Sequence, residues 1–241
     1  VFNGSNGMEF RFNSVDGAEK YNIYRREVNG QFGAPVGTIS QSTLVEYRYV
    51  DNTAVSGIQY VFGVQSVYGD IKSAITESDL ACCLDEPKVQ LEAAYGGVNL
   101  SWKAVRGAEK YAIYYATTKK ADDLKLLTTV TDTSYLHKGA TSGRNNYYAV
   151  MAICGDTIST VTLQYIYYLA VPEIIEFKNY KASLTMKFED ILGADKYDVY
   201  RKVYGEDKRE KIDVELSYKE VTVDEEEIIY GSGTCKDVVE R

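Results

Sequence analysis

Histidine and cysteine are the side chains best suited to nucleophilic or metal chemistry, and this chain of 241 residues has one histidine and four cysteines. A zinc site draws on several such residues, commonly with a Cys-x-x-Cys pair, and the sequence contains no such pair. His137 stands where a turn between two strands is expected. A catalytic thiol needs a base beside it, and a single histidine offers little choice. We therefore expect no catalytic residue, no metal ligand and no cofactor site.

Acidic residues occur in two runs, Asp122-Asp123 and residues 224–227. A calcium loop places oxygen ligands at alternate positions around a turn glycine, and neither run has this spacing. Glu19, Glu109 and Asp195 recur at equivalent positions along the chain. A glycosidase needs two carboxylates facing each other across a cleft, which a recurring position does not provide. We interpret the runs as solvated loops and the recurring carboxylates as turn residues.

Tyrosine is the unusual entry in the composition, with 22 tyrosines against one tryptophan and seven phenylalanines. Tyrosine favours strands and suits a half-buried face whose hydroxyl reaches water or a partner. Exposed tyrosines can stack on sugars or pack on a protein. Tyr114, Tyr115 and Tyr147 are our candidates for an interaction surface. The alternative is that these rings serve the core or the packing between domains.

An eight-residue pattern decides the expected architecture, because it occurs three times at nearly equal spacing. Each copy reads Gly-Ala, an acidic residue, Lys-Tyr, a variable residue, an aliphatic residue and Tyr. We interpret Gly-Ala as a tight turn that leads into a strand. The three copies occupy residues 17–24, 107–114 and 193–200.

Upstream of each copy, apolar residues alternate strictly with polar ones, which is typical of a strand packed on one side. Short strands with turn signals at regular spacing favour a β-sandwich over an α/β fold. The alternating apolar residues are Met8, Phe10 and Phe12, then Val98, Leu100 and Trp102, then Leu184, Met186 and Phe188.

The second copy carries the clearest resemblance to a known family. Trp102 in a second strand, Gly107-Ala108 and Tyr111 in a third, and Tyr148-x-Val150-x-Ala152 later resemble the bacterial variety of fibronectin type III module. The resemblance covers essentially the whole chain. It implies an all-β fold of three tandem fibronectin type III-like antiparallel β-sandwiches in an elongated array. The scaffold itself hosts many functions.

We place the three repeats at residues 1–84, 85–170 and 171–241. The second is expected to be complete. The first is expected to lack its opening strand, and the third most of its last one, if residues 228–234 form its sixth strand. We therefore expect the chain to begin and end inside a longer array, or to receive edge strands from a partner by strand addition. The short linkers predict a semi-rigid rod.

The resemblance also suggests a cross-link. In this fold the chain enters at the end that carries the turn between the last two strands. Cys154 is therefore expected near the junction where Cys82 and Cys83 lie. We hypothesise a disulfide from Cys82 or Cys83 to Cys154, with Cys83–Cys154 as the favoured pair. The alternative is free buried thiols, which suit a reducing compartment.

The formal net charge of −8 and the absence of a basic stripe disfavour nucleic-acid binding. No apolar stretch approaches the roughly 20 residues that span a bilayer, so we expect no membrane insertion. The resemblance implies a non-catalytic structural spacer and protein-interaction or adhesion region of a larger bacterial surface or secreted protein, located extracellularly or at the cell surface. Flanking modules and an unidentified protein or glycan ligand are the expected partners.

Two alternatives remain open at this point. One is a carbohydrate-binding or accessory region of a glycan-degrading enzyme, which would use a platform of tyrosines. The other is a structural subunit that polymerises by exchanging edge strands, which the incomplete end repeats suggest.

Overall fold

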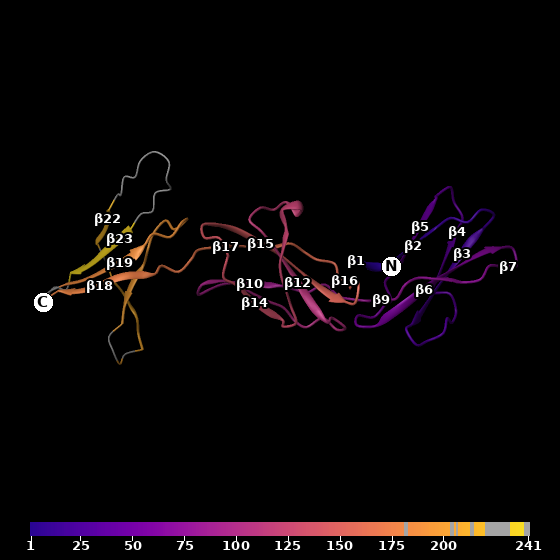
Figure 1. Ribbon diagram of the computed structural model, residues 1–241, viewed down its shortest axis with the longest axis horizontal. Helices are drawn as coiled ribbons and strands as arrows, with labels where there is room; N and C mark the ends of the chain where they lie inside the picture. Colours follow the sequence, from indigo (N-terminus) through magenta and orange to yellow (C-terminus); the bar gives the residue numbers. More distant parts are fainter. Residues whose placement is uncertain (181–182, 203–204, 206, 213–214, 220–231, 239–241) are drawn as a thin grey trace. The chain divides into compact units, whose positions relative to one another are not determined.

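The computed structural model describes residues 1–180, 183–202, 205, 207–212, 215–219 and 232–238. Apart from one 3-10 turn, η1 (Ala121–Asp123), the regular elements in these residues are β-strands (Figure 1). Their pairings are antiparallel. The expected all-β fold is confirmed. No helix in this described part of the chain is long and apolar enough to cross a membrane.

The chain divides into two compact units. The first holds residues 1–91, 99–135 and 147–165, and the second holds residues 92–98, 136–146 and 166–241. The first repeat lies within the first unit, whereas the second repeat contributes residues to both. The boundaries of the three repeats stay a prediction, and each unit is described by itself.

The first repeat is a two-sheet sandwich. One sheet has the order β1-β2-β5, and the other has the order β4-β3-β6-β7 with β8 and β9 also paired to β6. The bounds of the first sheet are β1 (Phe2–Gly4), β2 (Gly7–Asn13) and β5 (Glu46–Asp51). Those of the second are β3 (Lys20–Glu27), β4 (Gly37–Ser40), β6 (Gln59–Tyr68), β7 (Ile71–Lys72), β8 (Thr76–Glu77) and β9 (Ala81–Cys82).

The core of this sandwich is formed by the inward residues of both sheets, as the alternating pattern predicts. Phe10 of β2 stacks on Phe62 of β6 with ring centroids 5.7 Å apart. Phe12 of β2 meets Tyr21 of β3 edge to face at 5.1 Å. Such offset and edge-on ring pairs add to the free energy that the buried area itself provides. The buried cluster comprises Met8, Phe10, Tyr21, Ile23, Tyr47, Tyr60, Phe62, Ala81 and Cys83.

The opening strand, which we expected the first repeat to lack, is present in a three-residue form. β1 pairs antiparallel with β2, from Phe2 opposite Glu9 to Gly4 opposite Gly7. Arg11 lies over the ring of Phe2, with its guanidinium carbon 5.1 Å from the ring centroid. A two-residue turn after Gly4 returns the chain to β2, so few residues suffice for the pairing.

The second repeat has two sheets whose strand orders correspond to those of the first repeat. One has the order β10-β11-β14, and the other has the order β13-β12-β15-β16 with β17 also paired to β15. The first consists of β10 (Gln90–Ala94), β11 (Gly97–Ser101) and β14 (Ser134–His137). The second consists of β12 (Lys110–Ala116), β13 (Lys125–Val130), β15 (Arg144–Cys154), β16 (Thr157–Ile158) and β17 (Gln164–Tyr168).

The third repeat shows a four-stranded sheet of order β18-β19-β23-β22 and a separate hairpin of β20 and β21. β23 pairs with β19 in the same way as β5 pairs with β2 in the first repeat. The expected sixth strand at residues 228–234 is therefore corrected: residues 232–234 belong to a strand in the fifth-strand position, and residues 228–231 lie outside the described part. The bounds are β18 (Ile174–Tyr180), β19 (Ser183–Glu189), β20 (Val199–Arg201), β21 (Glu210–Ile212), β22 (Glu215–Lys219) and β23 (Ser232–Val238).

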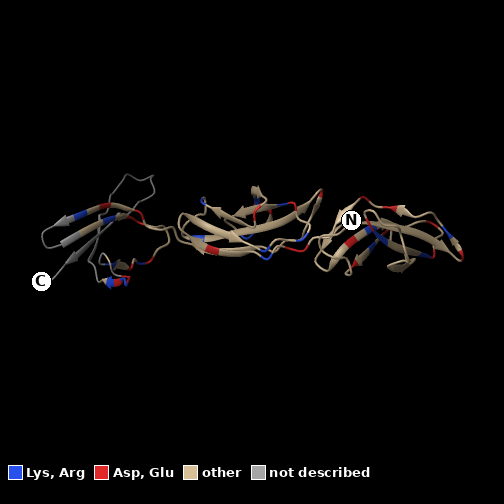
Figure 2. Cartoon of the chain, turned by 90° about the horizontal axis from the view of Figure 1, so that it is seen from below, with Lys and Arg blue, Asp and Glu red and all other residues tan. Residues whose placement is uncertain are grey.

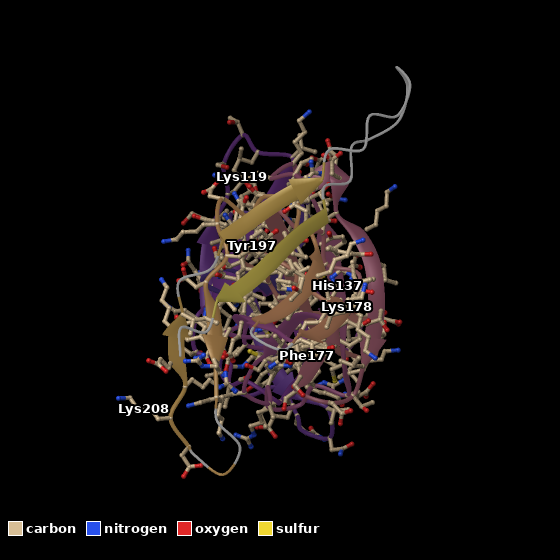
Figure 3. The ribbon with its side chains drawn as sticks, turned by 90° about the vertical axis from the view of Figure 1, so that its left-hand side faces the viewer. Lys119, His137, Phe177, Lys178, Tyr197 and Lys208 are labelled. Atoms are coloured by element: carbon tan, nitrogen blue, oxygen red, sulfur yellow. The ribbon has the colours of Figure 1, made fainter. Side chains whose placement is uncertain are left out.

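The eight-residue pattern recurs because its tyrosine closes the turn before it. The hydroxyl of Tyr21 accepts a hydrogen bond from the backbone N–H of Val15 at 2.8 Å. Tyr111 does the same for Val105 at 2.8 Å. In the third repeat Tyr197, labelled in Figure 3, accepts from Ile191 at 2.6 Å. The expected tight turn is confirmed: a tyrosine hydroxyl satisfies a backbone donor of the turn, and the ring is buried in the first two repeats.

The recurring carboxylates act on a different turn. Glu19 accepts a hydrogen bond from the N–H of Gly69 at 2.9 Å, and Glu109 accepts one from the N–H of Gly155 at 3.2 Å. In both repeats the carboxylate thus caps the turn at the end of β6 or β15. The interpretation of these carboxylates as turn residues is confirmed for both, although the turn that they bind is far away in the sequence.

Charged residues of both signs are interspersed along the described strands (Figure 2). Asp51 of β5 and Glu9 of β2 are both buried, and Glu9 is 3% exposed. Its two oxygens accept from the Nε atoms of Arg11 and Arg48 at 2.7 and 2.5 Å. Burial by itself would raise the pKa of Glu9, but the hydrogen bonds from the two arginines outweigh it and hold that pKa below its ordinary value.

Replacement of this carboxylate tests the ion-pair arrangement. Because the pKa of Glu9 is lower in the folded chain than in the unfolded one, its ionisation stabilises the fold above the unfolded pKa, and this contribution is lost as the pH falls through the folded value. We expect Glu9→Gln to unfold at lower urea concentration than the wild type at neutral pH, with the difference vanishing in acid. Urea denaturation followed by fluorescence at several pH values measures this. A difference that persists at all pH values would contradict it.

Candidate functional site

The three tyrosines proposed as an interaction surface do not share one face. Tyr114 and Tyr115 are neighbours in β12, and successive residues of a strand point to opposite sides of the sheet. Tyr115 stands opposite Tyr148 of β15, and their ring centroids are 5.3 Å apart. Tyr148 is fully buried, so Tyr115 belongs to the inner face. Tyr115 is therefore corrected from the surface to the edge of the core.

The outer face of the same sheet carries an apolar strip that we call the tyrosine strip. Tyr114 stands opposite Leu126 of β13, and Tyr147 stands opposite Ala116, two positions along β12 from Tyr114. The ring of Tyr165 in β17 lies 5.7 Å from that of Tyr147, and Tyr165 is 65% exposed. Tyr165 was not among the predicted residues, since nothing in its local sequence indicates that β17 pairs with β15. The strip comprises Leu126, Tyr114, Tyr147 and Tyr165.

His137, labelled in Figure 3, lies at the end of β14 and is buried. Burial lowers the pKa of its imidazole below the ordinary value, which keeps the ring neutral at physiological pH. The equivalent position in the first repeat is Asp51, which forms an ion pair with Arg25 and accepts hydrogen bonds from Thr53. Among the described residues no cluster of three or more potential ligands could hold a metal ion.

A buried asparagine takes the place of a tyrosine at the start of the long strand. In the first repeat the hydroxyl of Tyr60 accepts from the N–H of Val55 at 3.2 Å. In the second repeat Asn146 accepts from the N–H of Thr141 at 2.8 Å with its Oδ1, and its Nδ2 donates to the carbonyl of Thr141 at 2.9 Å. The donor lies five residues upstream in both cases. The carboxamide therefore closes the same loop that the phenol closes.

A serine-glycine turn, Ser56-Gly57, joins the first repeat to the second. Ser56 Oγ accepts from the N–H of Asp85 in the linker at 3.1 Å, and Gly57 donates its N–H to the carbonyl of Cys83 at 2.8 Å. A methyl group added at Gly107 would lie 2.6 Å from the Cα of Gly57, closer than real side chains approach. Gly107 also has a φ of +80°, which favours glycine.

The same contact recurs in the second unit, at Ser142-Gly143. Ser142 Oγ accepts from the N–H of Ala170 at 3.0 Å, and Gly143 donates its N–H to the carbonyl of Tyr168 at 2.8 Å. A methyl group added at Gly193 would lie 2.3 Å from the Cα of Gly143. The eight-residue pattern contains Gly107 and Gly193, but the contacts that they make with Gly57 and Gly143 join two repeats and therefore have no local signal.

The cysteines meet at the first of these junctions. Cys83 belongs to the core of the first repeat, whereas Cys82 points away from that core and its thiol lies close to that of Cys154. The favoured pair Cys83–Cys154 is therefore corrected, because alternation along the strand sends Cys83 inward and Cys82 outward. Cys82, Cys83 and Cys154 are free and buried in the structure. The side chain of Cys235 lies outside the described part.

Comparison with known proteins gives no match to a family model and none to a curated protein. Solved structures do match. The chain is similar to FN3tt (19% identity, 35% of this chain and 94% of that chain, TM-score 0.32). It is also similar to a two-domain fibronectin type III segment of chicken tenascin (14%, 67% and 93%, 0.36) and to the FN1–FN3 domains of chicken CNTN1 (13%, 68% and 63%, 0.33). All three are fibronectin type III structures.

Tyr60 and Asn146, which close the equivalent loop in the first and second repeats, can be compared by mutation. Asn146→Ala removes a fully buried carboxamide and leaves the N–H and the carbonyl of Thr141 without this partner, and we expect it to lower the free energy of unfolding by about 2–3 kcal/mol. Tyr60→Phe keeps the ring and removes one hydrogen bond, so a loss of about 1 kcal/mol is expected. Chemical denaturation of both variants measures the two values. A smaller effect for Asn146→Ala than for Tyr60→Phe would contradict this account.

Proposed function

We propose that this chain is a non-catalytic structural spacer and protein-interaction region of a larger bacterial surface or secreted protein. The observation that supports the proposal most directly is the recurrence of one contact, Gly57 with Gly107 and Gly143 with Gly193. In both pairs the contacting glycines are separated by the same length of chain. A spacer has to hold successive domains in a set relation, and a recurring backbone contact at each junction serves that purpose.

The neighbouring hydrogen bonds strengthen this argument. At each junction a serine hydroxyl holds the backbone of the linker, and the adjacent glycine N–H binds a carbonyl that precedes the linker. The linker is thus bonded to the body of the repeat before it. A linker held in this way behaves as a short, stiff connection rather than as a flexible tether.

The first two repeats offer a matched pair of glycine variants for testing the junction. Gly17 and Gly107 occupy equivalent turns, both have a φ of +80°, and only Gly107 contacts another repeat. We expect Gly17→Ala and Gly107→Ala each to lose about 1–2 kcal/mol from the backbone conformation. Only Gly107→Ala should also loosen the junction, seen as a broader distance distribution in small-angle X-ray scattering.

Limited proteolysis gives a second readout, since a loosened junction exposes residues 85–88 to cleavage after Lys88. Equal scattering profiles and equal cleavage for the two alanine variants would argue against a junction that sets the relation of the repeats. Independent tumbling of the repeats in the wild type, measured by NMR relaxation, would contradict the spacer proposal directly.

A carbohydrate-binding role is the second candidate, and the tyrosine strip supports it. Tyr147 and Tyr165 present two neighbouring rings on one sheet face, and Tyr165 is mostly exposed. Aromatic faces of this kind can stack on the apolar face of a sugar ring. Beside the strip, a hollow of about 390 Å³ is lined by Tyr115, Thr118 and Asp122 among others, and it offers polar groups for sugar hydroxyls.

A glycan array probed with the purified chain tests this second role. If a glycan binds, we expect Tyr147→Ala and Tyr165→Ala each to weaken its affinity about fivefold, since each removes one stacking ring. Tyr95 is the control, because it is 80% exposed in the turn between β10 and β11 and is not part of the strip. Equal loss on Tyr95→Ala, or no bound glycan on the array, would remove the carbohydrate-binding candidate.

A further inference from the structure

Cys82 is buried by the second repeat rather than by its own. In β9 and the residue after it, Ala81 and Cys83 enter the core of the first repeat, and Cys82 lies on the other side of the strand. Cys82 is nevertheless only 2% exposed, and Cys154 at the end of β15 is 6% exposed. The two thiols cover each other at the junction.

The hydrogen bonds around the two cysteines are reciprocal. Gln59 is the cross-strand partner of Cys82, and its Nε2 lies 3.7 Å from the sulfur of Cys154. Thr157 is the cross-strand partner of Cys154, and its Oγ1 accepts from the N–H of Cys82 at 3.1 Å. Each cysteine is therefore hydrogen-bonded to the residue that is the cross-strand partner of the other cysteine. This arrangement holds two strands from different repeats in a fixed relation.

A further side chain fastens the same strands. Asn3 donates through Nδ2 to the carbonyls of Cys82 and Ile158, at 3.0 Å each, and accepts from the N–H of Leu84 at 3.1 Å. Ile158 lies in β16, directly after Thr157. Asn3 thus bridges the strand that holds Cys82 and the hairpin that holds Cys154, so the approach of the two thiols does not depend on the thiols themselves.

The thiol pair is reachable from solvent through a hollow of about 390 Å³, which Cys82 and Cys154 both line together with Gly57 and Gly107. Burial raises the pKa of Cys82 to about 12, and the nearby Cys154, Cys83 and Glu109 act in the same direction. A thiol with this pKa is almost fully protonated at neutral pH. Because the thiolate is the reacting form, exchange at Cys82 is slow there and accelerates as the pH rises.

We propose that Cys82 and Cys154 are a disulfide site that covalently fastens the first repeat to the second when a small-molecule disulfide is present as oxidant. One cysteine thiolate attacks the small disulfide, forming a mixed disulfide and releasing one small thiol. The other cysteine then attacks the protein sulfur of that mixed disulfide, forming the Cys82–Cys154 bond and releasing the second small thiol. Two electrons pass from the two cysteines to the oxidant, and their two protons leave with the small thiols.

The site does not depend on the proposed function, because the cross-link can form whether or not the chain acts as a spacer. Its consequence is an oxidation-dependent stiffness of one junction. The second junction has no such pair among the described residues, since Tyr167 stands beside Gly193 where Cys82 stands beside Gly107.

The test uses the full chain, folded and reduced, incubated with oxidised glutathione in mildly alkaline buffer. Remaining thiols are alkylated in denaturant, and a non-reduced tryptic digest is analysed by mass spectrometry. We expect an intramolecular link between the peptide that holds Cys82 and the peptide that holds Cys154. Trypsin does not cut between Cys82 and Cys83, so Cys83→Ala serves as the matched control and should keep the link.

Cys82→Ser and Cys154→Ser should each abolish the link. Oxidation should raise the melting temperature of the wild type and leave that of Cys82→Ser unchanged. Several outcomes would overturn the proposal: four free thiols in the wild type, loss of the link in folded Cys83→Ala, a link through Cys235, or glutathione adducts that never close. If Cys83→Ala does not fold, fragmentation of the linked wild-type peptides still identifies which cysteine is joined.

Discussion

Neighbouring residues of a β-strand point to opposite faces of the sheet, and in this chain that alternation assigns nearly every side chain of interest. It sends Met8 and Phe10 into the core of the first repeat and leaves Glu9 between them on the other face, where two arginines neutralise it. It divides Tyr114 from Tyr115. It also divides Cys82 from Cys83, so that Cys83 packs in the core of the first repeat and Cys82 packs against the second repeat.

The regular part of the fold could be predicted from the sequence because its signals are local. Alternating apolar residues predict the strands, and the recurring Gly-Ala turn with its tyrosine predicts where the chain reverses. Contacts between residues that are far apart in the sequence could not be predicted in the same way. Glu19 is bonded to Gly69, and Tyr165 lies against Tyr147, over sequence distances that no short pattern covers.

The candidate site shows the same limit more sharply. Cys154 was placed near the first junction from the expected course of the chain, and the structure agrees. The choice of Cys83 as its partner was wrong, although alternation applied to residues 81–83 would have favoured Cys82. Asn146 takes the place of Tyr60 in the second repeat. That it forms an equivalent bond depends on the exact position of the Thr141 backbone, which only the folded loop defines.

The bonding of Cys82 and Cys83 has a mechanical consequence. Cys83 is bonded by its backbone to Ile58 and to Gly57, and Cys82 is bonded to Thr157 of the next repeat. Tension that pulls the two repeats apart therefore acts on the last strand of the first repeat, which is paired with β6, before it reaches the linker. The junction and that strand should yield under load as one unit, and a cross-link at Cys82 would direct the force past the linker into the core.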